Sequence, residues 1–321
     1  MPLHSTSSIF LPRIANGQTI GVMAPSSAIV PERFEAGLSI LKQRGFHVVI
    51  HPQTYLGVET GSQLCGSPAQ KAAAFMELWT DPKIDVIMAA GGGNFSSQFL
   101  HLLDFDKIAS SPKTVSGYSD TTALLSALYT KTRIGGFFGP TIQNLSHNGH
   151  LDQVFALYAA ADSIRIPLTG AKIITSARQC PPAPVFAATL SVLLSLAGTP
   201  YFPDLSGHIL ILEDIGDELS RIDRALWQLG QIVPFSALAG LIFGQFLNMT
   251  DTGRPLGFDW DGIIRKHTHE LNCPILTNAP IGHGRDLFPV PLGRFASIDF
   301  GLDSRTPDLI FEGISYKPTT L

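Results

Sequence analysis

The first half of the chain alternates short apolar runs with longer segments of helical pattern, which limits the fold more than any other feature. The apolar runs predict strands, and the segments between them have helical spacing. Such alternation predicts an open, mostly parallel α/β sheet that binds ligands beyond the carboxyl ends of its strands. The predicted strands cover residues 19–24, 47–50, 85–90 and 114–117, with 135–139 as a fifth candidate, and the predicted helices cover 31–44, 67–79 and 121–132, with another starting near Ser96.

This rhythm breaks over residues 163–184, where the sequence CPPAP excludes a helix interior because proline lacks the amide donor. We place an interdomain crossover at 166–184. It separates an N-terminal α/β domain over 1–165 from a smaller, β-rich C-terminal domain over 185–321. In the second domain the pattern predicts helices over 190–196 and 219–229 and strands over 208–212, 240–243, 295–299 and 308–311.

Composition and charge narrow the class of protein. The chain has 321 residues and a net charge of -4, with no basic run, so a nucleic-acid partner is not expected. No stretch approaches the roughly 18 apolar residues of a membrane span, and the apolar run at 9–11 is too short for a secretion signal. The three cysteines, Cys65, Cys180 and Cys273, are far apart and odd in number, so we expect neither disulfides nor a zinc site. This use of cysteine predicts a reducing compartment and hence a cytoplasmic location.

The stretch VSGYSDTTALL places Ser119 where a predicted strand ends and a helix begins. Two interpretations fit this position. Ser119 is a helix N-cap, or it is a nucleophile held at a sharp turn whose helix N-terminus stabilises an oxyanion. The G-x-S-x-G pattern of such a turn is half present, because Thr121 stands where the second glycine would be.

Three consecutive glycines follow the third predicted strand in AAGGGNFSS (89–97). Neither the Walker pattern nor G-x-G-x-x-G fits this loop. A phosphate loop, a loop of backbone-amide donors for an oxyanion, and a flexible turn with a helix cap at Ser96 all stay open.

Two further side chains are candidates for chemistry. Glu213 ends an apolar strand, where a carboxylate either pairs with a partner or serves a site. His283 lies between glycines in a loop, a favourable position for a base. His267 and His269 are two apart on a predicted helix, so they do not share a face that could bind a metal.

These stretches together resemble one family, the LD-carboxypeptidases, serine peptidases that include the microcin C immunity hydrolases. The resemblance runs in order from Gly21 to Gly293. It rests on GVMAPSS, GGNFSSQFL, GYSDTTALL, the Gly139-Pro140 pair, LAGTPYFPDLSGHILILEDIGDELSRIDRALWQL and PIGHGRDLFPVPLG.

The resemblance implies a Ser–Glu–His triad. Ser119 would be the nucleophile, Glu213 the acid and His283 the base, with the serine on a flavodoxin-like N-terminal domain and the other two on the C-terminal domain. The implied oxyanion donors are the backbone amides of Asp120 and of Gly92 or Gly93. Neither metal nor cofactor is implied.

The substrate implied is a murein tetrapeptide that loses its terminal D-alanine during cell-wall recycling, and a homodimer is compatible with the resemblance. Two alternatives remain. One is an amide hydrolase acting on aminoacyl nucleotides, as in the microcin branch, and the other is a non-catalytic α/β binding protein in which Ser119 is only a cap. Arg285 follows His283 by two residues and is our candidate for contacting a substrate carboxylate, against the alternative of a surface arginine.

The chain departs from the family pattern at two places. Ala187-Ala188-Thr189 stands where the family usually has Gly-Gly-Asn, and Gly91 and Asn94 stand where many members have arginine and tyrosine. The first change affects positions we expect near the substrate. We therefore expect these departures to bear on the identity of the substrate rather than on hydrolysis.

Overall fold

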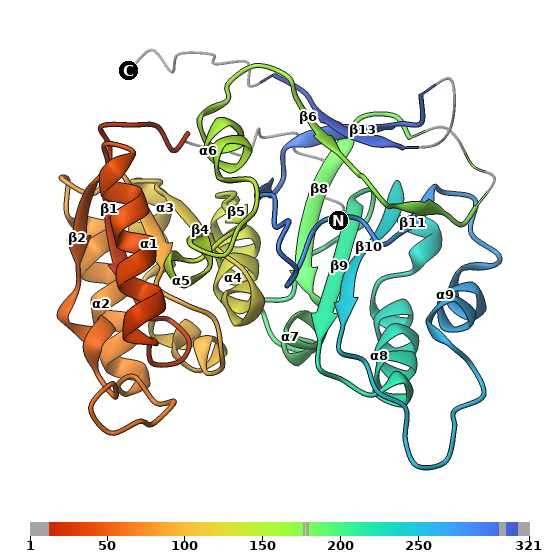
Figure 1. Ribbon diagram of the computed structural model, residues 1–321, viewed down its shortest axis with the longest axis horizontal. Coiled ribbons are helices and arrows are strands. Elements are labelled where there is room, and N and C mark those ends of the chain that lie inside the picture. Colours follow the sequence, from red (N-terminus) through yellow and green to blue (C-terminus); the bar gives the residue numbers. More distant parts are fainter. Residues whose placement is uncertain (1–12, 176, 178–179, 302–305, 314–321) are drawn as a thin grey trace.

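Two β-sheets flanked by helices make up the molecule, and they lie side by side in the computed structural model (Figure 1). The structure describes residues 13–175, 177, 180–301 and 306–313. The apolar run at 9–11 therefore lies outside the described residues.

The first sheet has the strand order β12-β5-β4-β3-β1-β2. All neighbours are parallel except β12, which pairs antiparallel with β5. Without β12 the order is that of flavodoxin-like sheets, in which the carboxyl ends of the parallel strands share one edge. The strands are β1 (Thr19–Met23), β2 (His47–Ile50), β3 (Val86–Ala89), β4 (Thr114–Gly117), β5 (Phe137–Phe138) and β12 (Val290–Pro291).

The helices of the first half begin at identifiable local signals. Pro31 starts α1, and Ser67 and Gln70 form a reciprocal capping box at the start of α2. The segment expected as a helix from Ser96 is a 3₁₀ helix, η2 (Ser96–Leu102). The α-helices are α1 (Pro31–Gln43), α2 (Pro68–Thr80), α3 (Phe105–Ser110), α4 (Thr122–Thr132), α5 (Ile142–Leu145) and α6 (Leu151–Ala159), and η1 (Pro52–Tyr55) and η3 (Ser119–Thr121) are further 3₁₀ turns.

The second sheet has the order β6-β14-β13-β8-β9-β10-β11-β7, with a parallel centre from β8 to β11. Two of its strands, β6 and β7, come from the stretch around the expected crossover, which thus adds strands to this sheet. The strands are β6 (Ile164–Pro167), β7 (Lys172–Ile173), β8 (Ala183–Thr189), β9 (Ile209–Ile215), β10 (Gly240–Leu247), β11 (Ile275–Thr277), β13 (Phe295–Asp299) and β14 (Asp308–Phe311). Its helices are α7 (Leu190–Ser195), α8 (Leu219–Ile232) and α9 (Trp260–Thr268), with a 3₁₀ turn η4 (Phe235–Ala237).

Helix α4 lies between the two sheets (Figure 1). The sequence predicts an amphipathic helix here, but residues 122–129 are all buried, including Ser126. These residues are buried on all sides because β4 and β5 of the first sheet and helix α7 pack against α4, and because Phe186 and Thr189 of β8 bring the second sheet against Tyr129 and Thr122. One hydrophobic core therefore runs from Phe75 and Leu125 into Ile211 and Phe243 without interruption.

Candidate active site

Ser119 sits at a sharp turn between β4 and α4. Its φ of 59° lies in the left-handed region, where a residue other than glycine is strained. The turn tolerates Thr121 because Gly117 has no side chain. A Cβ at residue 117 would lie 2.8 Å from Thr121 Cγ2 and 3.0 Å from Ala89 Cβ. The strained serine after a strand and before a helix is the geometry of a nucleophile elbow.

The side chain of Ser119 does not cap the helix. Neither η3 nor α4 has a side-chain hydrogen bond at its N-cap. Instead, Ser119 Oγ lies 3.0 Å from His283 Nε2, and His283 Nδ1 lies 2.6 Å from Glu213 Oε2. The three residues predicted from sequence therefore form one continuous hydrogen-bonded chain.

Glu213 is fully buried within β9, and burial raises the pKa of its carboxyl while the hydrogen bonds from His283 and Thr189 lower it. Thr189, at the end of the neighbouring strand β8, donates its hydroxyl to Glu213 Oε1. Both carboxylate oxygens are thus engaged. The neighbouring carboxylate of Asp214 accepts instead from the backbone amides of Ser191 at 2.8 Å and Ile215 at 2.9 Å.

The loop that carries His283 is held by β10. Gln245 donates its backbone amide to Ile281 O at 2.9 Å, and its Oε1 accepts from the Gly284 amide at 2.8 Å. These two bonds bracket His283. The ring of Tyr118 packs on the imidazole, with 4.9 Å between the ring centroids.

The glycine loop after β3 lies against the elbow. A Cβ at Gly92 would be 3.1 Å from Ser119 Cβ, so the backbone approaches the serine more closely than a larger residue would allow. Ser27 fixes this loop, because its amide donates to Gly92 O at 3.3 Å and its hydroxyl accepts from the Asn94 amide at 3.0 Å. No described residue accepts from the amide groups of Gly92 or Gly93.

Asp120 connects the elbow to η2. Its carboxylate accepts from the Ser96 amide at 2.9 Å, and its carbonyl accepts from the Ser96 hydroxyl. Burial raises the pKa of this carboxyl. The Asp120 side chain therefore holds the two loops together, and its backbone amide begins the first turn of η3, where N–H groups lack intrahelical partners.

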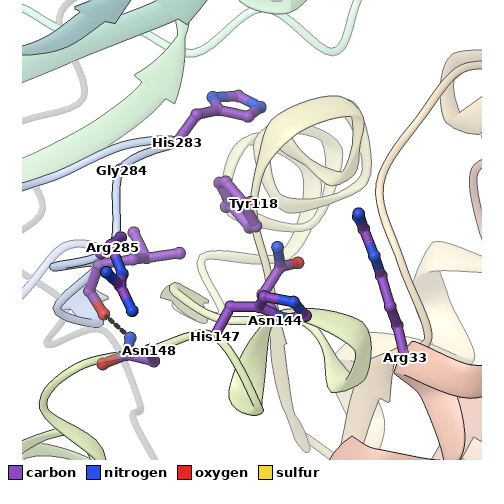
Figure 2. Close-up of a pocket in the computed structure, with 9 residues that line it drawn as sticks. Arg33, Tyr118, Asn144, His147, Asn148, His283, Gly284 and Arg285 are labelled. Carbon is purple, nitrogen blue, oxygen red and sulfur yellow. Dashed lines mark hydrogen bonds between the residues drawn. The ribbon is translucent and has the colours of Figure 1, made fainter.

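Arg285 lines a cavity of about 200 Å³ together with His283 and Tyr118 (Figure 2). The structure thus brings this predicted residue to the same cavity as the histidine.

The departures from the family pattern have structural explanations. A Cβ at Gly91 would lie 1.9 Å from Gln143 Nε2, so Gln143 occupies the space that a side chain at 91 would need. Ala187 and Ala188 are buried in β8 and do not line the cavity, whereas Thr189 contacts Glu213. The replacement of Gly-Gly-Asn by Ala187-Ala188-Thr189 thus changes the surroundings of the Glu213 carboxylate and not the cavity wall.

Charged residues of α8 have structural partners. Asp223 binds Lys266 and His267 across α8 and α9, and Arg221 lies 3.6 Å from Glu218.

In the described part of the chain no group of three or more His, Cys, Asp or Glu side chains could hold a metal ion. Nor is any helix of the described residues long and apolar enough to cross a membrane.

Sequence reasoning missed the supporting roles of Thr189, Gln245 and Ser27. Thr189 stands out only as a departure from the family pattern, and no local pattern marks the other two. Each acts on a residue distant along the chain, so its role depends on how the strands are ordered.

The fold and these contacts define a class: two-sheet α/β proteins with an elbow serine hydrogen-bonded to a histidine–glutamate pair. Family models for the N-terminal and C-terminal domains of LD-carboxypeptidases match residues 20–139 and 183–298. The chain belongs to the LD-carboxypeptidase family.

Individual relatives cover almost the whole chain. A putative carboxypeptidase of Streptomyces coelicolor is 30% identical, covering 92% of this chain and 95% of the relative. A probable murein peptide carboxypeptidase of Bacillus subtilis is 28% identical, with 90% and 92% covered. The solved structure of the microcin C7 self immunity protein in its wild-type apo state has a TM-score of 0.83 at 23% identity and covers 94% of this chain and 98% of its own, which supports the fold.

Proposed function

We propose that this protein is a serine LD-carboxypeptidase that releases the terminal D-alanine of murein tetrapeptides in the cytoplasm, as part of cell-wall recycling. One observation carries the proposal: Ser119, strained at the elbow, is hydrogen-bonded to an imidazole whose other nitrogen meets a buried carboxylate. Names of relatives such as the murein tetrapeptide carboxypeptidase of Pseudomonas aeruginosa, 26% identical to this chain, support the substrate.

The first step is attack on the amide carbonyl. His283 Nε2 takes the proton from Ser119 Oγ as the oxygen bonds to the carbonyl carbon, and Glu213 stabilises the imidazolium that forms. The buried position of Glu213 suits this role, because a carboxylate in a low-dielectric site interacts strongly with an adjacent cation.

The charge on the carbonyl oxygen needs preorganised donors. The free amides of Gly92 and Gly93 and the amide of Asp120 at the helix start are the donors we assign to it. In comparable hydrolases one such donor contributes about 3 kcal/mol.

The second half of the cycle reverses these proton transfers. His283 gives its proton to the leaving amine, so D-alanine departs and an acyl ester on Ser119 remains. Water then loses a proton to His283 and attacks the ester, and the proton returns to Ser119 as the peptide acid is released.

The test pairs a murein tetrapeptide ending in D-alanine with an aminoacyl sulfamoyl adenylate. The second compound probes the activity suggested by the microcin C7 immunity protein, whose structure has been solved in complex with glutamyl sulfamoyl guanosine. We expect D-alanine release from the tetrapeptide by the wild type and at least about a thousandfold loss in Ser119→Ala, which keeps its fold.

Covalent labelling gives an independent measurement. A serine-directed phosphonate should add one adduct at Ser119 in the wild type, and the rate should collapse in His283→Ala. If the protein hydrolyses only the adenylate, the microcin-type activity replaces the murein assignment. If Ser119 is not labelled and neither substrate is turned over, the result favours a binding protein.

A further inference from the structure

The cavity beside His283 has walls from both halves of the chain and carries positive charge. Arg33 reaches it from the first turn of α1, Arg285 from the histidine loop, and Tyr118 and Asn144 lie between them (Figure 2). No aspartate or glutamate lines it. Such a lining selects for an anionic ligand.

Neither arginine is neutralised. Within the described residues the guanidinium groups of Arg33 and Arg285 have no ion pair and no hydrogen bond. Arg44, by comparison, pairs with Asp152. The acidic neighbour of Arg285, Asp286, is engaged by His150 at 3.0 Å. The two cations therefore face the cavity with their donors free.

The walls that carry the arginines are fixed to one segment, residues 142–149. The Gly149 amide donates to Arg285 O at 3.0 Å. On the other wall, the amide of Val30, the N-cap of α1, donates to Gln143 Oε1 at 2.7 Å. The backbones that bear both arginines are thus set before a ligand arrives, which reduces the cost of ordering the site.

The position of the cavity identifies the part of the substrate it meets. Its lining includes His283, which gives a proton to the leaving amine, whereas Gly92 and Gly93 of the oxyanion loop are not part of it. Groups attached to the leaving nitrogen therefore enter this cavity. In an α-amino acid the free carboxylate is only two bonds from that nitrogen.

We propose that Arg33 and Arg285 form a two-walled subsite for the free carboxylate of the released residue, and that this subsite makes the enzyme select a chain end. The inference rests on the proposed function and deepens it. Arginine suits the task because its planar group makes paired hydrogen bonds to a carboxylate and stays charged.

The experiment compares a tetrapeptide ending in D-alanine with the same peptide ending in D-alaninamide. Arg33→Gln and Arg285→Gln should each lower kcat/KM for the acid about 10- to 100-fold, as expected for a lost charge-assisted contact, and change it little for the amide. Arg224→Gln, which removes an exposed arginine from α8, is the matched control and should leave both substrates unchanged. Arg285→Lys should recover part of the loss.

Equal losses on acid and amide would overturn the subsite, and a selective loss in one arginine variant alone would overturn its two-walled form. Calorimetric binding to Ser119→Ala separates this inference from the proposed function, because it needs no turnover. Tighter binding of the acid than the amide, abolished by either arginine substitution, supports the subsite even if the wild type cleaves neither peptide. Equal binding of both peptides contradicts it.

Discussion

At the scale of single residues, Ser119 is one of five described residues other than glycine whose backbone has a left-handed φ. Its left-handed φ is costly for any residue with a Cβ and free for glycine. We expect the free energy of unfolding of Ser119→Gly, measured by chemical denaturation, to be about 1 kcal/mol higher than that of Ser119→Ala. Both variants should be inactive.

The matched control for this comparison is Ser126, in the middle of α4. In an ordinary helical conformation, glycine makes a protein about 1 kcal/mol less stable than alanine does. At this position Ser126→Gly should therefore have a lower free energy of unfolding than Ser126→Ala, the reverse of the order at residue 119. The same order at both positions would contradict the strain at residue 119.

Thr189 is the residue through which the departure from Gly-Gly-Asn acts on the proposed triad. Its hydroxyl is a hydrogen-bond donor to a buried carboxylate, and Thr189→Val removes that donor without changing the shape. We expect the free energy of unfolding to fall by about 2 kcal/mol and kcat/KM to fall about tenfold.

Thr189→Ser keeps the hydroxyl and should stay close to the wild type in activity and in free energy of unfolding. If valine and serine behave alike, the contact with Glu213 has no role in the reaction.

At the scale of elements, β10 positions the loop of His283 through Gln245. A Cβ at residue 284 would lie 1.9 Å from Gln245 Oε1, so Gly284→Ala should push the side chain away and displace the histidine. We expect at least about a tenfold loss in kcat, since small misplacements of catalytic groups are costly.

A double variant tests this explanation. Gln245→Ala removes the clash together with the hydrogen bond, so Gln245→Ala/Gly284→Ala should be no less active than Gln245→Ala alone. Losses that simply add would show that the two residues act independently.

At the scale of the whole molecule, a buried pair joins the two halves of the chain. Tyr129 of α4 and His208, just before β9, meet at 2.8 Å between the hydroxyl and Nε2. Burial lowers the pKa of His208 and raises the pKa of Tyr129 to about 12, so the folded protein holds both groups neutral.

This pair predicts a specific loss of stability in acid. In the unfolded chain histidine titrates near pH 6.5, and in the folded protein at a lower pH. The stability that neutral His208 contributes is therefore complete above about pH 6.5 and is lost as the pH falls through the folded pKa. Over this range the free energy of unfolding should change by at most about 1.4 kcal/mol per pH unit. Denaturation of His208→Gln between pH 7.5 and 5 should show a shallower profile than the wild type.

His47 supplies the control for the pH experiment. It is exposed on β2, and no described residue hydrogen-bonds its side chain, so His47→Gln should follow the wild-type profile. Parallel profiles for His208→Gln and the wild type would contradict a neutral, buried His208.

Much of the fold was predictable because its signals are local. Apolar runs such as 85–90 and caps such as Ser67 act within a few residues, so they predict β3 and α2 without knowledge of the partners. The same holds for the glycine before the elbow and for Ser119 itself. The assignment of Glu213 and His283 to one site came from the resemblance, and their hydrogen bonds agree with that expectation.

By itself the sequence determined the class of fold, the strands β1 to β5 with the helices α1, α2 and α4, and the serine, glutamate and histidine that meet. Only the tertiary structure decided that residues 122–129 of α4 are buried, that β12 pairs with β5 in the first sheet, that Thr189 and Gln245 hold the glutamate and the histidine loop, and that Arg33 lines the cavity. The reason is physical. Backbone conformation depends mainly on near neighbours along the chain, whereas these contacts arise from sheet order and from packing between residues far apart in sequence.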